Sequence, residues 1–184
     1  MRNAMRKVVF IDRDGVINVD LWKYVETWKE FRFEKGALDA LKILTDKGFD
    51  IYIISNQAGV GDGVFSEAAM WQVHEKMVAA MAKREIKIRG ARYCPHAKKA
   101  KCDCRKPKTQ LLEKAVAKTD FDRKKTYFVG DKFSDLEAGV NFGIRTILVR
   151  TGYGAETEKK LTKKLQPDHI VNNLRDAVPF ILKA

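Results

Sequence analysis

The chain has 184 residues, a formal net charge of +12 and a hydrophobic content of 45%. This length and this apolar share are typical of one folded domain with its own core, and we expect residues 1–184 to form a single domain. No apolar run approaches the roughly 20 residues of a membrane-spanning helix, and no apolar signal core follows the basic start from Met1 to Lys7. We therefore expect a cytoplasmic protein without a membrane partner.

The positive charge is compatible with a nucleic-acid partner, with an anionic small molecule, or with a solvated, lysine-rich surface. The densest basic patches are Lys98–Lys101, Arg123–Lys125 and Lys159–Lys164. No aromatic residues are interleaved with these patches, as a surface that stacks bases would require. We therefore favour a small phosphorylated metabolite over nucleic acid, and we expect a monomer.

Short apolar runs alternate with segments of helical spacing along the whole chain. We expect six strands, at Lys7–Asp12, Phe49–Ser55, Ala91–Cys94, Thr126–Gly130, Arg145–Val149 and His169–Val171. We expect helices at Ala37–Asp46, from Ser66 to about Arg84, after Pro107, from a cap at Ser134 to Gly143, and from about Leu174 to Leu182. The alternation predicts an α/β fold, a doubly wound parallel sheet of the Rossmann-like type with three layers, α/β/α.

Two loops between these elements have unusual compositions. Residues 18–33 hold Trp22, Tyr24, Trp28 and Phe31, which predict either a flap over a site or a local cluster that anchors the loop. Gly59, Gly61 and Gly63 predict an irregular loop after the second strand.

Polar side chains follow four of the predicted strands at or just past their carboxyl ends. They are Asp12 and Asp14 after the first strand, Ser55 and Asn56 after the second, Lys106 beyond the third, and Asp131 after the fourth. In a doubly wound sheet these ends share the edge where ligands bind. Carboxylates grouped there suit Mg²⁺, and with a lysine they suit phosphoryl transfer. Because no nucleotide-binding loop is present, water is the natural acceptor, which predicts a phosphatase.

All three cysteines lie in one segment with a histidine, in the pairs Cys94-Pro95-His96 and Cys102-Asp103-Cys104. Three free cysteines in an exposed loop are the alternative. A closed Cys₃His set is the preference of structural Zn²⁺, so we expect Cys94, His96, Cys102 and Cys104 to bind zinc. The metal would hold the loop that delivers Arg105 and Lys106 to the site.

The motifs DRDGV at residues 12–16, SNQ at 55–57, Lys106 before a helix and GDKFSD at 130–135 resemble those of the haloacid dehalogenase superfamily of phosphohydrolases. The resemblance implies that Asp12 is a nucleophile forming an aspartyl-phosphate and that Asp14 moves protons. It implies Mg²⁺ held by Asp12, the backbone carbonyl of Asp14, and Asp131. Ser55 and Lys106 would hold phosphoryl oxygens. Asp135 would act from behind them, on water or on Lys106, unless it is only a favourable acid in the first turn of a helix.

The cysteine segment is similar to that of a zinc-bearing branch without a large cap domain, which contains heptose bisphosphate phosphatases and histidinol-phosphate phosphatases. This resemblance favours a heptose bisphosphate, with histidinol phosphate or another small phosphomonoester as the alternatives, and it implies substrate contacts from Asn56, Arg105 and Lys132. Asp62 departs from the arginine usual in that loop, and we expect it to influence substrate choice. A non-catalytic zinc-stabilised nucleic-acid-binding module is a distant alternative.

Overall fold

The structure, a computed structural model, describes residues 5–183. The basic start predicted from Met1 to Lys7 therefore lies largely outside the described residues. Within residues 5–183, no helix combines the length and the apolar character needed to cross a membrane.

Six strands form one sheet in the order β3-β2-β1-β4-β5-β6, and every neighbouring pair is parallel. Their bounds are β1 Lys7–Ile11, β2 Phe49–Asn56, β3 Ile88–Cys94, β4 Tyr127–Gly130, β5 Arg145–Val149 and β6 His169–Val171. In β1, Phe10 pairs with Tyr52 of β2 and with Phe128 of β4, so β1 lies between two other strands. The predicted parallel α/β sheet is confirmed.

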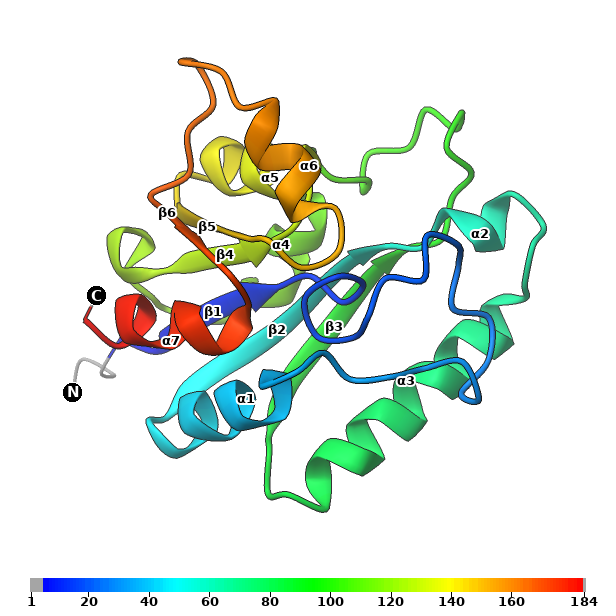
Figure 1. Ribbon diagram of the computed structural model, residues 1–184, viewed down its shortest axis with the longest axis horizontal. Helices are drawn as coiled ribbons and strands as arrows, with labels where there is room; N and C mark the ends of the chain where they lie inside the picture. Colours follow the sequence, from blue (N-terminus) through cyan, green and yellow to red (C-terminus); the bar gives the residue numbers. More distant parts are fainter. Residues whose placement is uncertain (1–4, 184) are drawn as a thin grey trace.

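Helices cover both faces of this sheet (Figure 1). Their bounds are α1 Ala37–Asp46, α2 Ala58–Gly61, α3 Glu67–Ala82, α4 Gln110–Val116, α5 Phe133–Phe142, α6 Gly154–Lys159 and α7 Leu174–Leu182, with a 3₁₀ turn at Arg123–Lys125. Side chains alternate along a strand, so Val9 and Ile11 pack with α1, α3 and α7, whereas Val8 and Phe10 pack with α4 and α5. The continuous apolar run of β1 is thus buried on both sides.

Some element boundaries were predicted wrongly. The glycine loop contains the short helix α2, where a Cβ on Gly61 would lie 2.0 Å from the backbone nitrogen of Ala97. That glycine therefore permits close packing rather than a turn. Strand β3 begins at Ile88 rather than Ala91, because Arg89 and Gly90 interrupt the apolar run on this edge strand. The helix after Pro107 begins only at Gln110, and α6 was not predicted.

The cap of α5 also differs from the prediction, because the helix already includes Ser134. The carboxylate of Asp135 accepts hydrogen bonds from the backbone nitrogens of Asp131, at 3.2 Å, and Lys132, at 3.0 Å. These bonds satisfy free donors at the helix start, so α5 begins at Phe133. Asp135 thereby fixes the turn that carries Asp131.

The aromatic loop at residues 18–33 runs from the end of β1 past α2 and α3 to α1 (Figure 1). Its second half is an anchor: Trp28 stacks on Phe31 with ring centroids 4.9 Å apart, and Phe31 meets Phe33 edge-on at 5.0 Å. These rings pack against the core that includes Leu41. The first half, with Trp22 and Tyr24, instead lines a cleft at the carboxyl edge of the sheet.

Candidate active site

Lys106 lies between two carboxylates at the carboxyl edge of the sheet. Its Nζ atom is 3.0 Å from Asp12 Oδ1 and 2.6 Å from Asp135 Oδ1, and all three side chains are at most 6% exposed. Nζ also donates to the backbone oxygen of Ile54 in β2, at 2.8 Å. The structure therefore brings together residues from the ends of β1 and β2, the loop after β3, and the first turn of α5, as the sequence predicted.

Burial and charge oppose each other in this cluster. Burial favours the neutral amine of Lys106, but the neighbouring carboxylates of Asp12 and Asp135 raise its pKa above the ordinary value. Burial raises the pKa of Asp12, and the charge of Lys106 counteracts that rise. The cluster thus holds a fixed positive charge beside a carboxylate with little water around it.

Asp131 offers an oxygen that no hydrogen bond uses. Its Oδ2 atom accepts from the backbone nitrogen of Tyr153 at 2.8 Å, whereas its Oδ1 atom is buried without a hydrogen-bond partner among the described residues. Burial raises the pKa of Asp131 well above its ordinary value. Carboxylate oxygens of Asp12, Asp131 and Asp135 lie within 4.8 Å of one another. A buried, unpaired carboxylate oxygen in such a group fits a hard cation.

Gly15 allows the loop after β1 to close over Asp131. Its φ is +85°, and a Cβ there would lie 2.3 Å from Asp131 Oδ2. Both the left-handed backbone and the close approach require glycine, which explains why a glycine follows the two acids of the first motif.

Asp14 is held by three neighbouring side chains. Its Oδ1 atom accepts from Arg13 Nη2 at 2.9 Å and from Asn18 Nδ2 at 3.0 Å, and its Oδ2 atom accepts from Gln57 Nε2 at 2.7 Å. Burial alone would raise the pKa of Asp14, but the Arg13 guanidinium and these hydrogen bonds lower it below its ordinary value. Asp14 is therefore a carboxylate that stays ionised at neutral pH.

Gln57 and Asn56 have positioning contacts that the sequence analysis did not identify. Gln57 Nε2 lies 3.0 Å from Ser55 Oγ and so links the predicted Ser55 to Asp14. Asn56, predicted to contact substrate, donates to the backbone oxygen of Lys106 and accepts from its backbone nitrogen, both at 3.1 Å. It therefore holds the loop of Lys106 while also lining the cleft. The SNQ motif was the sequence feature that marked Asn56 and Gln57 as residues of interest.

A cleft of about 420 Å³ opens beside these residues. It is lined by Asp14, Asp20, Trp22, Lys23, Tyr24, Asn56, Ala58, Lys98, Arg105, Lys132 and Tyr153. The predicted Arg105 and Lys132 both reach it, with Lys23 and Lys98 as further cations. Lys132 Nζ lies 3.1 Å from Asp20 Oδ2 and 4.5 Å from the centroid of the Tyr153 ring. The lining therefore has four cationic side chains against the two carboxylates of Asp14 and Asp20, which suits an anionic ligand.

The predicted zinc ligands come together in the loop after β3. Cys94 Sγ lies 3.7 Å from Cys102 Sγ and 3.6 Å from His96 Nδ1, which is 3.2 Å from Cys104 Sγ. One ligand atom from each residue lies within 4.8 Å of all the others. Burial, with hydrogen bonding to the other thiols, raises the pKa of Cys94 to about 12. Three sulfur donors and one imidazole nitrogen at this separation fit one tetrahedral cation, which would also favour the thiolate form of the cysteines.

The Cys/His loop, residues 94–104, touches both Arg105 and α2. The guanidinium of Arg105 donates to the backbone oxygen of His96. Asp62, at the end of α2, accepts from the backbone nitrogen of Lys98 at 3.3 Å and from the Tyr24 hydroxyl at 3.4 Å. The Asp62 carboxylate thus contacts two residues that line the cleft.

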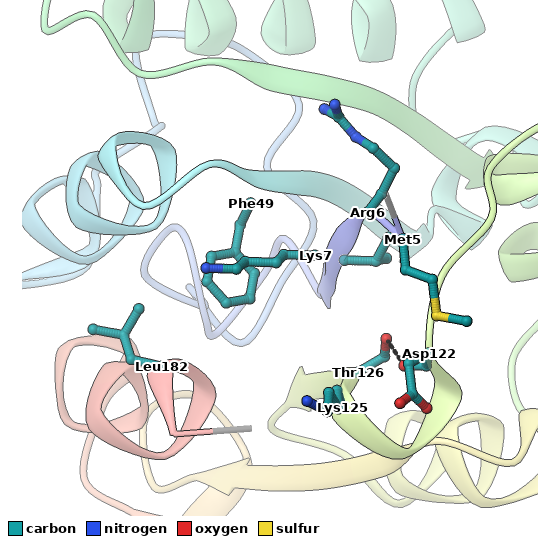
Figure 2. A pocket seen from close by; sticks show the side chains of 9 residues that line it. Met5, Arg6, Lys7, Phe49, Asp122, Lys125, Thr126 and Leu182 are labelled. Carbon is teal, nitrogen blue, oxygen red and sulfur yellow. Dashed lines mark hydrogen bonds between the residues drawn. The ribbon is translucent and has the colours of Figure 1, made fainter. Parts of the chain in front are cut away.

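A second hollow lies at the opposite edge of the sheet, where β1, β2 and β4 begin (Figure 2). It has a volume of about 240 Å³, and Lys7 extends across the ring of Phe49 within it. None of the predicted site residues lines this hollow. The site residues predicted from the sequence therefore belong to the carboxyl edge of the sheet and not to this hollow.

Comparison with known proteins supports the family resemblance that the sequence motifs indicated. A HAD-hydrolase-like family model matches residues 103–177. A D-glycero-β-D-manno-heptose-1,7-bisphosphate 7-phosphatase of Haemophilus ducreyi is 39% identical, over 96% of this chain and 98% of its own length. The enzyme of that name from Escherichia coli is 36% identical, over 95% and 93%.

A solved structure shares the fold as well. The D,D-heptose 1,7-bisphosphate phosphatase of B. bronchiseptica, complexed with magnesium and phosphate, superposes with a TM-score of 0.90 at 29% identity, over 96% of this chain and 98% of that one. Because the chain agrees with these proteins in sequence and in fold, it belongs to the HAD-like hydrolases, as a phosphoric monoester hydrolase of the family that contains the heptose 1,7-bisphosphate 7-phosphatases.

Proposed function

We propose that this enzyme removes the 7-phosphate of D-glycero-D-manno-heptose 1,7-bisphosphate, with Asp12 as the nucleophile. The observation that carries the proposal is the contact of Asp12 with a buried, charged Lys106, 3.0 Å away, beside a cleft with basic walls. This arrangement stabilises negative charge where a phosphoryl group would be transferred.

In the first step, a carboxylate oxygen of Asp12 attacks phosphorus and the bond from phosphorus to the sugar oxygen breaks. This gives an aspartyl-phosphate and the sugar alcohol, and water then hydrolyses the aspartyl-phosphate to release inorganic phosphate. Lys106 compensates the negative charge of the phosphoryl oxygens, and Lys106 and Ser55 together orient these oxygens. Asp135, 2.6 Å from Lys106, keeps the lysine charged and in place.

Asp14 supplies the proton to the leaving sugar oxygen and later takes one from the attacking water. Its low pKa in the free protein suits the second task, because an ionised carboxylate can act as a base. An incoming phosphoryl group adds negative charge nearby and raises the pKa of Asp14, which is the direction needed for the first task.

Two metals fit the residues. Asp12, Asp131 and the backbone carbonyl of Asp14 would hold Mg²⁺, for which the unpaired Oδ1 of Asp131 provides a ligand. When bound, Mg²⁺ neutralises charge on the phosphoryl group. Cys94, His96, Cys102 and Cys104 would hold a structural Zn²⁺ that leaves no coordination position open.

The substrate is inferred from the relatives and from the cleft. The relatives from Haemophilus and Escherichia carry a heptose 1,7-bisphosphate phosphatase name, and they cover nearly the whole chain. A bisphosphate needs cationic groups for the phosphate that is not cleaved, and Arg105 and Lys132 line the cleft for that purpose. We propose that loops of one domain, without a separate cap, form this site.

Phosphate release measured with Mg²⁺ tests the proposal. The panel contains both anomers of the heptose 1,7-bisphosphate, histidinol phosphate and common hexose phosphates, compared by kcat/KM. We expect one heptose anomer to exceed every other compound by at least about tenfold. A higher kcat/KM for histidinol phosphate or for a hexose phosphate would overturn the assignment of the substrate.

A further inference from the structure

Trp22 occupies a position that a large aromatic residue rarely takes. Its side chain is among the most exposed apolar ones in the described residues, at 63%. Its φ is +60°, in the left-handed region, which is unfavourable for a bulky side chain. Both features are costly for the fold, and strained residues of this kind concentrate at ligand sites.

Specific contacts hold Trp22 in this conformation. Its backbone nitrogen donates to Asp20 Oδ1 at 2.8 Å, and the same carboxylate reaches Lys132 through its other oxygen at 3.1 Å. The Asp20 side chain is only 7% exposed. The indole ring packs edge-on against Tyr153, with centroids 4.5 Å apart. Asp20 thus holds the backbone of Trp22, and Tyr153 holds its ring, next to Lys132.

The ring also lines the cleft that opens beside the reactive groups. Trp22, Tyr24 and Tyr153 are the aromatic residues of its lining, and the carboxylate of Asp14 lines it as well. A phosphate ester bound with its phosphorus at Asp12 must extend its carbon chain through this cleft. Sugars present C–H faces to which aromatic rings bind, while their hydroxyls remain hydrogen-bonded.

We propose that the indole ring of Trp22 is a specificity-determining contact that packs against the carbon skeleton of the sugar phosphate. This inference rests on the proposed function for its ligand class, and it adds a residue that recognises the sugar rather than either phosphate. Trp71 provides the contrast. It is also exposed, at 38%, but it lies on α3 against His74 and Tyr93 and does not line the cleft.

Steady-state kinetics on D-glycero-D-manno-heptose 1,7-bisphosphate test the proposal, with inorganic phosphate as a competitive inhibitor without a carbon skeleton. In Trp22→Gly, which accepts the left-handed backbone, we expect KM to rise about three- to tenfold, the range of one lost aromatic contact. The kcat and the Ki of inorganic phosphate should stay within twofold of wild type. Trp22→Phe should restore most of the affinity, and Trp71→Ala should match wild type.

An unchanged KM in Trp22→Gly, or an equal rise in the Ki of inorganic phosphate, would overturn the proposal. A fluorescence titration separates this outcome from a failure of the proposed function. We expect the bisphosphate to change the emission of the wild-type protein and of Trp71→Phe but not that of Trp22→Phe. If the wild-type protein does not hydrolyse the bisphosphate, the proposed function fails, while the emission change still decides the role of Trp22.

Discussion

The two polar clusters of this protein are built in opposite ways. The lysine–carboxylate cluster of Asp12, Lys106, Asp131 and Asp135 joins residues far apart in sequence, and the parallel sheet brings them together. The Cys/His cluster lies within residues 94–104 and is formed by the last residue of β3 and the loop that follows it. The first depends on the whole fold, whereas we propose that the second is held by one cation bound to its four donors.

The two clusters also handle charge differently. Lys106 neutralises buried carboxylates within the protein itself, so removing it leaves charge without compensation. In the second cluster, burial and the neighbouring thiols raise the pKa of Cys94 to about 12. Damage to the first cluster should therefore affect chemistry and folding directly, and damage to the second should act through metal loss.

The largest effect is expected from Asp12→Asn, which keeps the volume of the side chain and removes the nucleophile. We expect kcat to fall at least about a thousandfold, with an unchanged circular dichroism spectrum. Asp50→Asn is the matched control, because Asp50 is also buried but pairs with Arg6 at the opposite edge of the sheet. If Asp12→Asn keeps even a tenth of the activity, Asp12 is not the nucleophile.

Lys106→Met should be the next most damaging change, because it leaves Asp12 and Asp135 buried without their cation. We expect a loss of about 3–5 kcal/mol in the free energy of unfolding, measured by urea denaturation at neutral pH. The exposed Lys108, which pairs with Asp103, gives the control Lys108→Met, for which we expect a change within about 0.5 kcal/mol.

The same variant has an expected pH dependence. Burial raises the pKa of Asp12, and without Lys106 nothing at that position counteracts the rise, so ionisation of Asp12 opposes folding. The deficit relative to wild type should be full above this raised pKa and should shrink as the pH falls through it. A deficit that grows in acid would contradict this account of Lys106.

Metal removal should have a smaller but clear effect through the Cys/His cluster. We expect one Zn²⁺ per chain in the purified protein and none in Cys102→Ser, measured by atomic emission. The melting temperature should fall by at least about 5 °C, and activity should fall because the loop carrying Arg105 and Lys106 loses its anchor. Chelation of the wild-type protein should reproduce the loss and added Zn²⁺ should reverse it. Unchanged melting after verified removal would exclude a structural metal.

The difference between the clusters also explains what could be predicted from the sequence. The strands at the centre of the sheet are continuous apolar runs, so their ends were predictable, and with them the positions of Asp12, Ser55 and Asp131. The cysteine spacing made the second cluster visible locally. Both sets of residues could therefore be found from patterns in the sequence: the ends of apolar runs for the first cluster and the cysteine spacing for the second.

Features that depend on side-chain direction were not predictable in the same way. The helical turn α2 was not predicted because its glycines are typical of loops. The start of α5 is set by Asp135 rather than by Ser134. Gln57, which joins Ser55 to Asp14, stood inside a recognised motif without a visible role. The split of the aromatic loop into an anchored half and a cleft-lining half follows no periodicity, because loop side chains alternate in no fixed pattern.

The smallest effect is expected at Asp62, where the Cys/His loop meets the cleft. Its bonds to Lys98 and Tyr24 are long, at 3.3 and 3.4 Å, and Asp62→Asn keeps an acceptor oxygen there. The melting temperature should therefore change by only about 1–2 °C. Removing a negative charge beside two cleft residues should nevertheless lower KM for the heptose bisphosphate about twofold, and not for the cationic histidinol phosphate. The ratio of the two kcat/KM values is the measurement, because a ratio equal to that of wild type would leave Asp62 as a loop contact without influence on substrate choice.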